Sequence, residues 1–142
     1  MIELQDHIET DRLPQLMELF GSAWWTTSRT IEDVEAMLRG SELVFALVDR
    51  AADRLVGFAR VITDDVYLAM VLDLIVAQDA RKKGLGAVLM DAVIGHPRLK
   101  SVRSVELVCQ PELVAFYRRW GFTDQVGLSR LMRLTTGGTP NS

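Results

Sequence analysis

Six residues near the middle of the chain combine positive charge with backbone freedom. Residues 81–86 read Arg-Lys-Lys-Gly-Leu-Gly and directly follow an apolar run that ends near Val76. A helix that begins inside such a loop leaves its first N–H groups without intrahelical partners, and its dipole adds partial positive charge there. Glycines let the backbone approach a ligand closely. The loop therefore predicts an anion site, with a phosphate or pyrophosphate as the expected occupant.

Three phosphate-binding patterns compete for this loop. A P-loop needs G-x-x-x-x-G-K-[ST], which is absent, and a dinucleotide loop needs a third glycine where this chain has Leu89. The remaining pattern is R-x-x-G-x-G, formed by Arg81, Gly84 and Gly86. A helix start with solvated basic side chains is the alternative without function. A second motif favours the functional interpretation, because residues 116–122 read Phe-Tyr-Arg-Arg-Trp-Gly-Phe about thirty residues later.

The two motifs together resemble the GNAT acetyltransferase superfamily, and the resemblance covers about residues 43–134. Residues 57–64 and the pair Trp24–Trp25 also resemble small bacterial GNAT proteins without a settled substrate. The resemblance implies an α/β fold with a mixed (α+β) sheet. That sheet is expected to be mostly antiparallel, with one splayed parallel strand pair and helices on both faces.

The resemblance also implies a binding site for acetyl-CoA in the opening between the splayed strands. Backbone groups of three strand residues would pair with the pantetheine arm, and N–H groups of the loop would cradle the pyrophosphate. The implied cofactor-binding residues are Leu74, Ile75, Val76, Arg81, Lys82, Lys83, Gly84, Leu85, Gly86 and Ala87. Residues 110–112 read Gln-Pro-Glu and lack the Asn that many members carry there, so this position has no assigned role.

Two side chains are candidates for catalysis. A lysine-like amine is neutral in only about one molecule in 2,500 at pH 7, so a general base is useful. Asp73 is the only charge in the apolar run 67–76, where desolvation would raise its pKa; a structural role at a bulge is the alternative. Tyr117 matches the family tyrosine that often protonates the departing thiolate, although it also shares a helical stripe with core residues.

The remaining reactive residues give weaker signals. Cys109 has no evident histidine to activate it and is expected to be a small buried hydrophobe. His7 and His96 lack metal-ligand spacing, so no metal is predicted. Trp24–Trp25 could wall an acceptor pocket or belong to the core, and Arg29 could bind an anionic acceptor or be solvated.

These residues must be positioned by alternating strand-like and helix-like segments, in the order βααβββαβαβ. The expected strands are 2–4, 43–48, 55–62, 67–76, 102–108 and 128–134, and the expected helices are 10–20, 30–40, 84–94 and 111–120. Thr10 or Asp11 is expected to cap the first helix and Thr30 the second. The helix 84–94 is apolar almost all round, which predicts deep packing.

Composition sets the broad class of protein. The chain has 142 residues, 49% hydrophobic and 25% charged, with a net charge of −3. These values predict one globular domain, residues 1–134, followed by a polar tail, 135–142. The acidic balance argues against a general nucleic-acid binder, and the longest apolar stretch, 67–77, is shorter than the roughly 20 residues that span a bilayer. A cytoplasmic protein without a membrane partner is expected.

The sequence thus predicts an N-acetyltransferase that moves an acetyl group from acetyl-CoA to a primary amine by direct attack in a ternary complex. The acceptor would be a small-molecule or peptide amine, and a homodimer is one option for the assembly. Two alternatives stay open at this point. One is a catalytically silent domain that senses acyl-CoA, and the other is a nucleotide-binding module that uses the same loop for a different phosphate.

Overall fold

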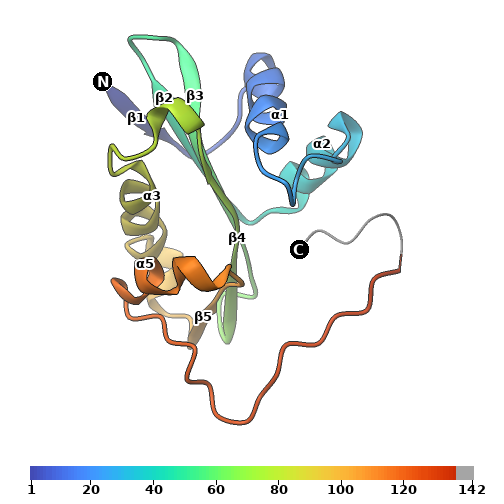
Figure 1. Ribbon diagram of the computed structural model, residues 1–142, viewed down its shortest axis with the longest axis vertical. Coiled ribbons are helices and arrows are strands. Elements are labelled where there is room, and N and C mark those ends of the chain that lie inside the picture. Colours follow the sequence, from blue (N-terminus) through green and yellow to red (C-terminus); the bar gives the residue numbers. More distant parts are fainter. Residues whose placement is uncertain (137–142) are drawn as a thin grey trace.

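A five-stranded mixed sheet organises residues 1–136, the part of the chain that the computed structural model describes (Figure 1). Its strands are β1 (Ile2–Gln5), β2 (Leu43–Asp49), β3 (Arg54–Thr63), β4 (Leu68–Val76) and β5 (Ser104–Glu106), which lie side by side in chain order. The first three pairs are antiparallel and the pair β4–β5 is parallel. The mixed α/β class is therefore confirmed.

Helices cover both faces of this sheet. They are α1 (Leu13–Gly21), α2 (Ile31–Gly40), α3 (Leu85–Ile94), α4 (Pro97–Lys100) and α5 (Val114–Arg118), with short 3-10 turns η1 (Thr10–Arg12), η2 (Gln78–Ala80) and η3 (Pro111–Leu113). Figure 1 shows α1 and α2 on one side of β4, and α3 and α5 on the other. This arrangement confirms the expected layers and places the basic loop between β4 and α3.

Apolar side chains from both helix layers bury the sheet. On the side of α1, Phe20 and Phe58 of β3 meet edge to face with ring centroids 5.7 Å apart. On the side of α3, Leu89 and Met90 are fully buried. Val88, however, is 43% exposed, so the expectation that this helix is packed almost all round is wrong on that side.

The helix starts differ in how their free N–H groups are satisfied. Thr30 caps α2 as predicted, because its hydroxyl accepts a hydrogen bond from Asp33 N at 3.2 Å. The predicted cap of the first helix is wrong, since neither Thr10 nor Asp11 accepts a hydrogen bond at a helix start. The 3-10 turn η1 leads directly into α1 there, so a side-chain cap has no place.

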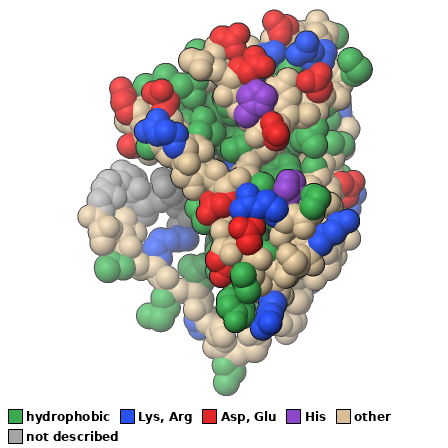
Figure 2. Space-filling model, turned by 180° about the vertical axis from the view of Figure 1, so that it is seen from behind, with side chains coloured by type: hydrophobic (Ala, Val, Ile, Leu, Met, Phe, Trp, Pro, Cys, Tyr) green, Lys and Arg blue, Asp and Glu red, His purple; other side chains and the backbone are tan. Residues whose placement is uncertain are grey.

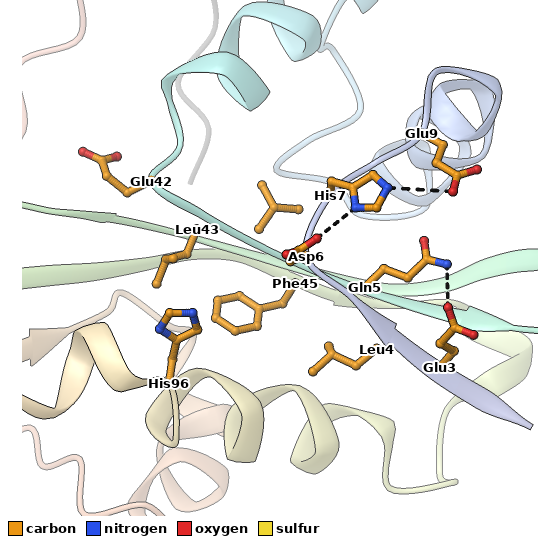
Figure 3. A pocket seen from close by; sticks show the side chains of 11 residues that line it. Glu3, Leu4, Gln5, Asp6, His7, Glu9, Glu42, Leu43, Phe45 and His96 are labelled. Atoms are coloured by element: carbon orange, nitrogen blue, oxygen red, sulfur yellow. Dashed lines mark hydrogen bonds and ion pairs between the residues drawn. The ribbon is translucent and has the colours of Figure 1, made fainter.

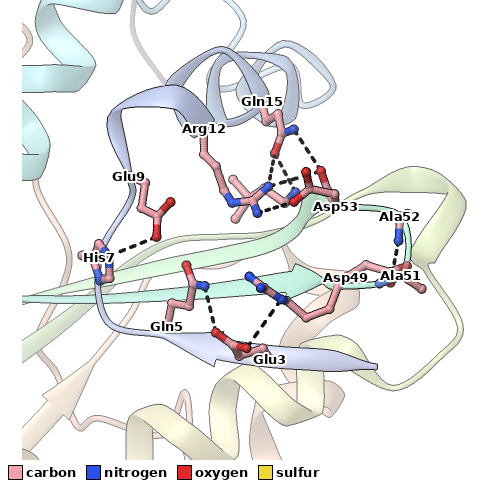
Figure 4. Close-up of polar contacts among 12 residues, drawn as sticks. Glu3, Gln5, His7, Glu9, Arg12, Gln15, Asp49, Ala51, Ala52 and Asp53 are labelled. Carbon is pink, nitrogen blue, oxygen red and sulfur yellow. Dashed lines mark hydrogen bonds and ion pairs between the residues drawn. The ribbon is translucent and has the colours of Figure 1, made fainter.

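A polar cluster fastens α1 to the turn between β2 and β3 (Figure 4). The buried Arg12 donates from Nη2 to Asp53 Oδ1 at 2.7 Å, and Gln15 Oε1 accepts from Leu55 N at 2.8 Å. Asp53 adopts a left-handed backbone conformation, with φ of 50°. This contact fixes the position of α1 on the sheet.

The last third of the chain departs most from expectation. The predicted strand 102–108 forms only as the three-residue β5, and the short helix α4, capped by His96 Nδ1 accepting from Arg98 N at 3.1 Å, was not predicted. The predicted strand 128–134 is wrong, because these residues form no strand and are exposed. Of the predicted tail 135–142, residues 137–142 lie outside the described part of the chain.

Within residues 1–136, no helix combines the length and the apolar content that crossing a bilayer requires.

Candidate active site

The parallel strands β4 and β5 separate shortly after they begin. β5 pairs with Leu68, Ala69 and Met70, the first three residues of β4. On the opposite side, β3 follows β4 as far as Val76. Among the described residues, the β5-facing edge of β4 is therefore without a strand partner from residue 71 onward. The predicted pantetheine-binding residues 74–76 lie on this open edge, whose backbone groups can pair with an extended ligand.

A backbone irregularity marks the point where β4 opens. The β3–β4 register shifts between Phe58 and Arg60, opposite Asp73 of β4. Asp73 has a φ of 56°, in the left-handed region that a non-glycine residue rarely adopts. This geometry is that of a β-bulge, which bends a strand and re-aims its side chains. The bulge interrupts the pairing of β4 with β3, which resumes at Ile75 and Val76.

The basic loop after β4 has the backbone geometry of an anion-binding nest. Lys82 and Gly84 have positive φ values of 67° and 75°, and the residue between them does not. Alternation of this kind turns successive N–H groups toward one point. Gly84 is the N-cap of α3, so the helix start adds its own free N–H groups. Open space surrounds Gly84, because a Cβ built there meets nothing within 4 Å.

The basic side chains of the loop are exposed, as the prediction of a polar ligand requires. Arg81 Nε donates to the carbonyl of Val76 at 3.3 Å and so joins the loop to the open end of β4. Lys83 lies beside the ion pair of Arg54 and Asp79, at a surface hollow. Positive charge therefore lies on the same loop as the nest.

The first turn of α3 packs directly on α5. A Cβ at Gly86 would lie 3.3 Å from Phe116 Cζ, so this glycine allows the close approach of the two helices. The next residue, Tyr117, is 8% exposed and meets Phe116 and Phe122 edge to face. The contact brings the two sequence motifs together, with the loop and Tyr117 at neighbouring positions.

Burial, with a smaller contribution from nearby Cys109, raises the pKa of Tyr117 to about 12. Its hydroxyl group makes no hydrogen bond with any residue of the described chain. Tyr117 therefore keeps its proton throughout the neutral range, and it can act as a proton or hydrogen-bond donor but not as a base.

Asp73 is held by two guanidinium groups. Its Oδ2 accepts from Arg29 Nη1 and from Arg60 Nε, both at 2.7 Å, and its Oδ1 accepts from Arg29 Nη2 at 2.9 Å. Desolvation acts to raise the pKa of Asp73, but the hydrogen bonds and charges of Arg29 and Arg60 outweigh it and hold the pKa below its usual value. The expected rise in pKa is therefore wrong.

Sequence reasoning did not identify Arg60 as part of this cluster. The signal was present, since Arg60 is a charge within the apolar strand β3, just as Asp73 is within β4. Arg29 was considered, and its side chain is 17% exposed, with the guanidinium carbon 4.9 Å from the Phe20 ring centroid. The interpretation of Arg29 as simply solvated is thus wrong.

The remaining candidates lie at the margins of the site. Trp25 packs against the core, whereas Trp24 is 59% exposed and does not belong to the core. Burial raises the pKa of the Cys109 thiol, and nearby Asp124 and Glu112 raise it further. A thiol with a raised pKa is a poor nucleophile, which agrees with the interpretation of Cys109 as a packing residue.

A hollow of about 650 Å³ lies at the opposite edge of the sheet, where β1 and β2 meet. Figure 2 shows the face on which acidic side chains and the two histidines gather. In Figure 3, His96 lies beside Phe45, and His7 turns toward Asp6 and Glu9. Among the described residues, no group of three His, Cys, Asp or Glu side chains could hold a metal ion. The hollow is distant in the sheet order from β4, β5 and the loop.

Comparison with protein families and solved structures gives matches over most of the chain. A family model described as an acetyltransferase (GNAT) domain matches residues 17–131. A protein from Xanthomonas campestris pv. campestris, whose crystal structure is described as that of a GNAT family member, is 27% identical. It superposes with a TM-score of 0.80, and the match covers 96% of this chain and 94% of that one.

Curated relatives carry the same kind of name. The uncharacterised N-acetyltransferase ycf52 of Porphyra purpurea is 31% identical over 127 residues, which cover 85% of this chain and 72% of that protein. Chloroplastic serotonin N-acetyltransferase 2 of Oryza sativa subsp. japonica is 37% identical over 97 residues, which cover 66% of this chain and 48% of that protein. The chain thus spans between about half and three quarters of the length of these relatives.

Proposed function

Because the chain belongs to the GNAT acetyltransferase family, we propose that it transfers the acetyl group of acetyl-CoA to a primary amine. One observation carries this proposal. The nest at Lys82 and Gly84 lies directly beyond the open edge of β4. An anion cradle next to unpaired strand backbone suits a ligand that has a diphosphate at one end and an amide-containing arm at the other.

Each part of this surface has a distinct role in the proposal. Backbone groups of Leu74, Ile75 and Val76 bind the amide-containing arm as an added strand. The N–H groups from Lys82 to Ala87 hold the diphosphate, with the charge of the basic side chains beside them. Held in this way, the thioester supplies an activated acetyl group. The chief contribution of the protein is to position it against the amine.

Tyr117 is proposed to donate its proton, or a hydrogen bond, to the departing sulfur. A thiolate with a pKa near 8.5 is a fair leaving group by itself, so the expected benefit is modest. The pKa of about 12 keeps Tyr117 protonated at every pH at which the enzyme would work. A protonated tyrosine with an unpartnered hydroxyl group suits this role.

Asp73 is proposed to position Arg29 and Arg60 rather than to remove a proton. Its two oxygens already accept three hydrogen bonds, and its lowered pKa makes it a weak base. The acceptor then loses its proton to solvent. The kcat/KM of the enzyme should accordingly rise with pH toward the pKa of the acceptor amine, without an inflection from Asp73.

Coenzyme binding is tested by thermal unfolding with CoA, NAD or ATP. A ligand at 100 times its Kd stabilises a protein by about 2.7 kcal/mol, so CoA should raise the Tm by several degrees. Gly84→Asp places bulk and negative charge in the nest and should abolish this shift. Gly127→Asp is the matched control, because Gly127 also has a positive φ and open space around it. Protection by ATP or NAD instead of CoA would favour a nucleotide-binding module.

Turnover is tested by CoA release with a panel of amines that includes serotonin, a polyamine and a peptide with a free N-terminus. Tyr117→Phe should lower kcat by about tenfold to a hundredfold while the CoA-induced Tm shift remains. The matched control is Tyr67→Phe, since Tyr67 is 60% exposed and stacks on Arg103, away from the loop. CoA binding without turnover of any amine would instead indicate a silent sensor of acyl-CoA.

A further inference from the structure

The ion cluster at the bulge of β4 carries more positive than negative charge. Arg29 and Arg60 each contribute one positive charge, whereas Asp73, the carboxylate that joins them, contributes one negative charge. Within residues 1–136, neither arginine forms an ion pair with any other residue. All three side chains are largely buried, so the remaining positive charge lies mostly out of water. A charge in such a place is costly unless a partner neutralises it.

Arg60 supplies the hydrogen-bond donors that this cluster leaves over. Its Nε donates to Asp73 Oδ2 at 2.7 Å, but within the described chain neither Nη1 nor Nη2 has a hydrogen-bond partner. Arg29, by contrast, directs both of its terminal nitrogens at Asp73. The planar fork of a guanidinium group binds carboxylate and phosphate groups through two parallel hydrogen bonds. The terminal nitrogens of Arg60 are therefore suited to an anionic group.

The face of the sheet that carries Arg60 is accessible beyond the helix layer. Arg60 lies between Val44 of β2 and Leu72 of β4, on the same face as Phe58, which packs on α1. Two residues further along β3, Ile62 points to this face and is 42% exposed. The helices α1 and α2 thus leave this end of the face open, and 14% of the Arg60 side chain is exposed. A small molecule can approach the cluster from this end.

The cluster also lies at the end of β4 where the acetyl group belongs in the proposed function. There the diphosphate is held by the loop after β4, and the amide-containing arm follows residues 74–76. An arm that starts at the loop and runs along this edge ends toward Asp73, at the bulge. The thioester therefore comes to lie beside the residue that holds Arg29 and Arg60.

From these observations we infer that the acceptor is a primary amine with an anionic group, a carboxylate or a phosphate, and that Arg60 binds this group. The inference rests on the proposed function, because it concerns the acceptor of the same reaction. The anionic group accepts from Nη1 and Nη2 and neutralises the remaining positive charge, while Asp73 fixes the guanidinium through Nε. In the transfer the amine nitrogen bonds to the acetyl carbon and the carbon–sulfur bond breaks, with the protons moving as in the proposed function. The anionic group itself does not react.

CoA release with paired acceptors tests the inference. The two members of a pair share the amine and differ in the anionic group: ω-amino acids of increasing chain length against their amides, and phosphoethanolamine against ethanolamine. At equal concentrations of unprotonated amine, at least one anionic member should have a kcat/KM about tenfold or more above that of its neutral partner. The pair with the largest ratio shows whether a carboxylate or a phosphate is bound. Neutral members that react as well in every pair would overturn the inference.

Arg60→Met removes the guanidinium group and keeps an apolar stem. It should lower the kcat/KM for the anionic acceptor about tenfold to a hundredfold, mainly through KM, and leave the kcat/KM for the neutral partner nearly unchanged. Arg12→Met is the matched control, because Arg12 is also largely buried and bonded to an aspartate, Asp53, at the turn between β2 and β3. The control should lower stability without changing the preference. Equal losses with both acceptors in Arg60→Met would show that Arg60 is only structural.

A measurement on the wild-type protein tests the same contact if Arg60→Met does not fold. The analogue of the best anionic acceptor that lacks the amine should raise the KM for that acceptor and leave kcat unchanged, with acetyl-CoA saturating and ionic strength constant. The neutral amide of this analogue should not inhibit. Equal inhibition by the two compounds, or none by either, would contradict an anion site at Arg60.

The two proposals fail in different ways. If CoA neither raises the Tm nor is released with any amine, the proposed function is wrong, and the inference falls with it. If CoA is released but only with neutral amines, the proposed function stands and the anionic acceptor alone is wrong.

Discussion

Asp73 illustrates how one side chain can hold separate parts of the molecule together. Its carboxylate is 6% exposed and joins Arg29, from the segment between α1 and α2, to Arg60 of β3. The two arginine side chains are 17% and 14% exposed, so their charges lie largely out of water. Removing one member of such a cluster leaves the remaining charges buried without a partner. The resulting loss of stability is larger than the net stability that the intact cluster contributes.

We therefore expect Asp73→Asn to lower the free energy of unfolding by about 3 kcal/mol at pH 7. The folded pKa of Asp73 lies below its unfolded value, so this stability is present above pH ~4 and is lost as the pH falls further. Urea unfolding of both proteins between pH 3 and pH 7 measures the difference, which should shrink at the acid end.

Asp65→Asn is the matched control for Asp73→Asn. Asp65 also has a positive φ and accepts two hydrogen bonds from an arginine, Arg98, but the pair is exposed. Loss of the exposed ion pair between Asp65 and Arg98 should leave the midpoint of urea unfolding nearly unchanged. Equal effects of the two substitutions would show that burial does not set the strength of the Asp73 cluster.

The sequence was informative about which residues matter and less so about their state. Asp73 stood out because it is the one charge of an apolar run, but its pKa was predicted in the wrong direction. The error arose because desolvation can be estimated from one strand, whereas the compensating arginines come from 44 and 13 residues away. Tyr117 meets Phe116 and Phe122, which lie close to it in the sequence, so the burial of this side chain could be predicted from its own segment.

At the scale of elements, α3 and α5 approach each other closely at Gly86 and Phe116. Gly86 lies in the first turn of α3, where Ala would gain up to about 1 kcal/mol of helix propensity. The 3.3 Å approach of its Cβ position to Phe116 opposes that gain. We expect Gly86→Ala alone to give no increase in the free energy of unfolding. In the Phe116→Leu variant, where the ring is absent, the same substitution should increase it. The coupling free energy between the two positions should be at least about 0.5 kcal/mol.

Urea unfolding of the four proteins in this double-mutant cycle measures the coupling. Additive effects would mean that the ring of Phe116 can move aside without cost. The packing of α3 and α5 would then not be coupled at this point.

Capping offers a second prediction at this scale. Thr30→Ala removes the hydroxyl group that accepts from Asp33 N, and should cost about 1 kcal/mol of stability. Thr10→Ala is the control, because the side chain of Thr10 caps no helix. Both variants are compared by thermal unfolding. A larger loss from Thr10→Ala would contradict the assignment of the caps.

Elements with long periodic patterns were predicted well, as α3 and the strands β2 to β4 show. Short ones were not, because α4 has four residues and β5 has three, too few for a periodicity to emerge. The strand expected at 128–134 does not form, because a strand also needs a neighbour to accept its hydrogen bonds, and no pattern within the segment supplies one.

At the scale of the whole molecule, carboxylates dominate the response to acid. Hydrogen bonds lower the pKa values of several exposed aspartates, from arginine side chains or, for Asp64, from backbone N–H groups: Asp53, Asp64, Asp65, Asp79 and Asp124. Each contributes stability that is present above the unfolded pKa of about 3.9 and is lost as the pH falls below it.

We therefore expect the Tm to be nearly constant from pH 7 to pH 5 and to fall below pH ~4. The fall should be partly masked in high salt, which weakens exposed pairs. Scanning calorimetry across this range at two salt concentrations measures both effects. A Tm that is independent of pH down to 3 would contradict it.

The composition and the two motifs were sufficient to predict the class of fold and the family. Both predictions depend on patterns that repeat along the chain or lie within a few residues of one another.

The bond between Arg29 and Asp73 joins residues 44 positions apart, and this has a consequence for the order of folding. Closing so large a loop costs entropy that only an assembled sheet repays, so we expect the link to form late. The segment that carries Trp24 and Trp25 then becomes fixed after the strands have paired. In stopped-flow refolding of a Trp120→Phe chain, indole emission should therefore lag behind the far-ultraviolet signal of the sheet.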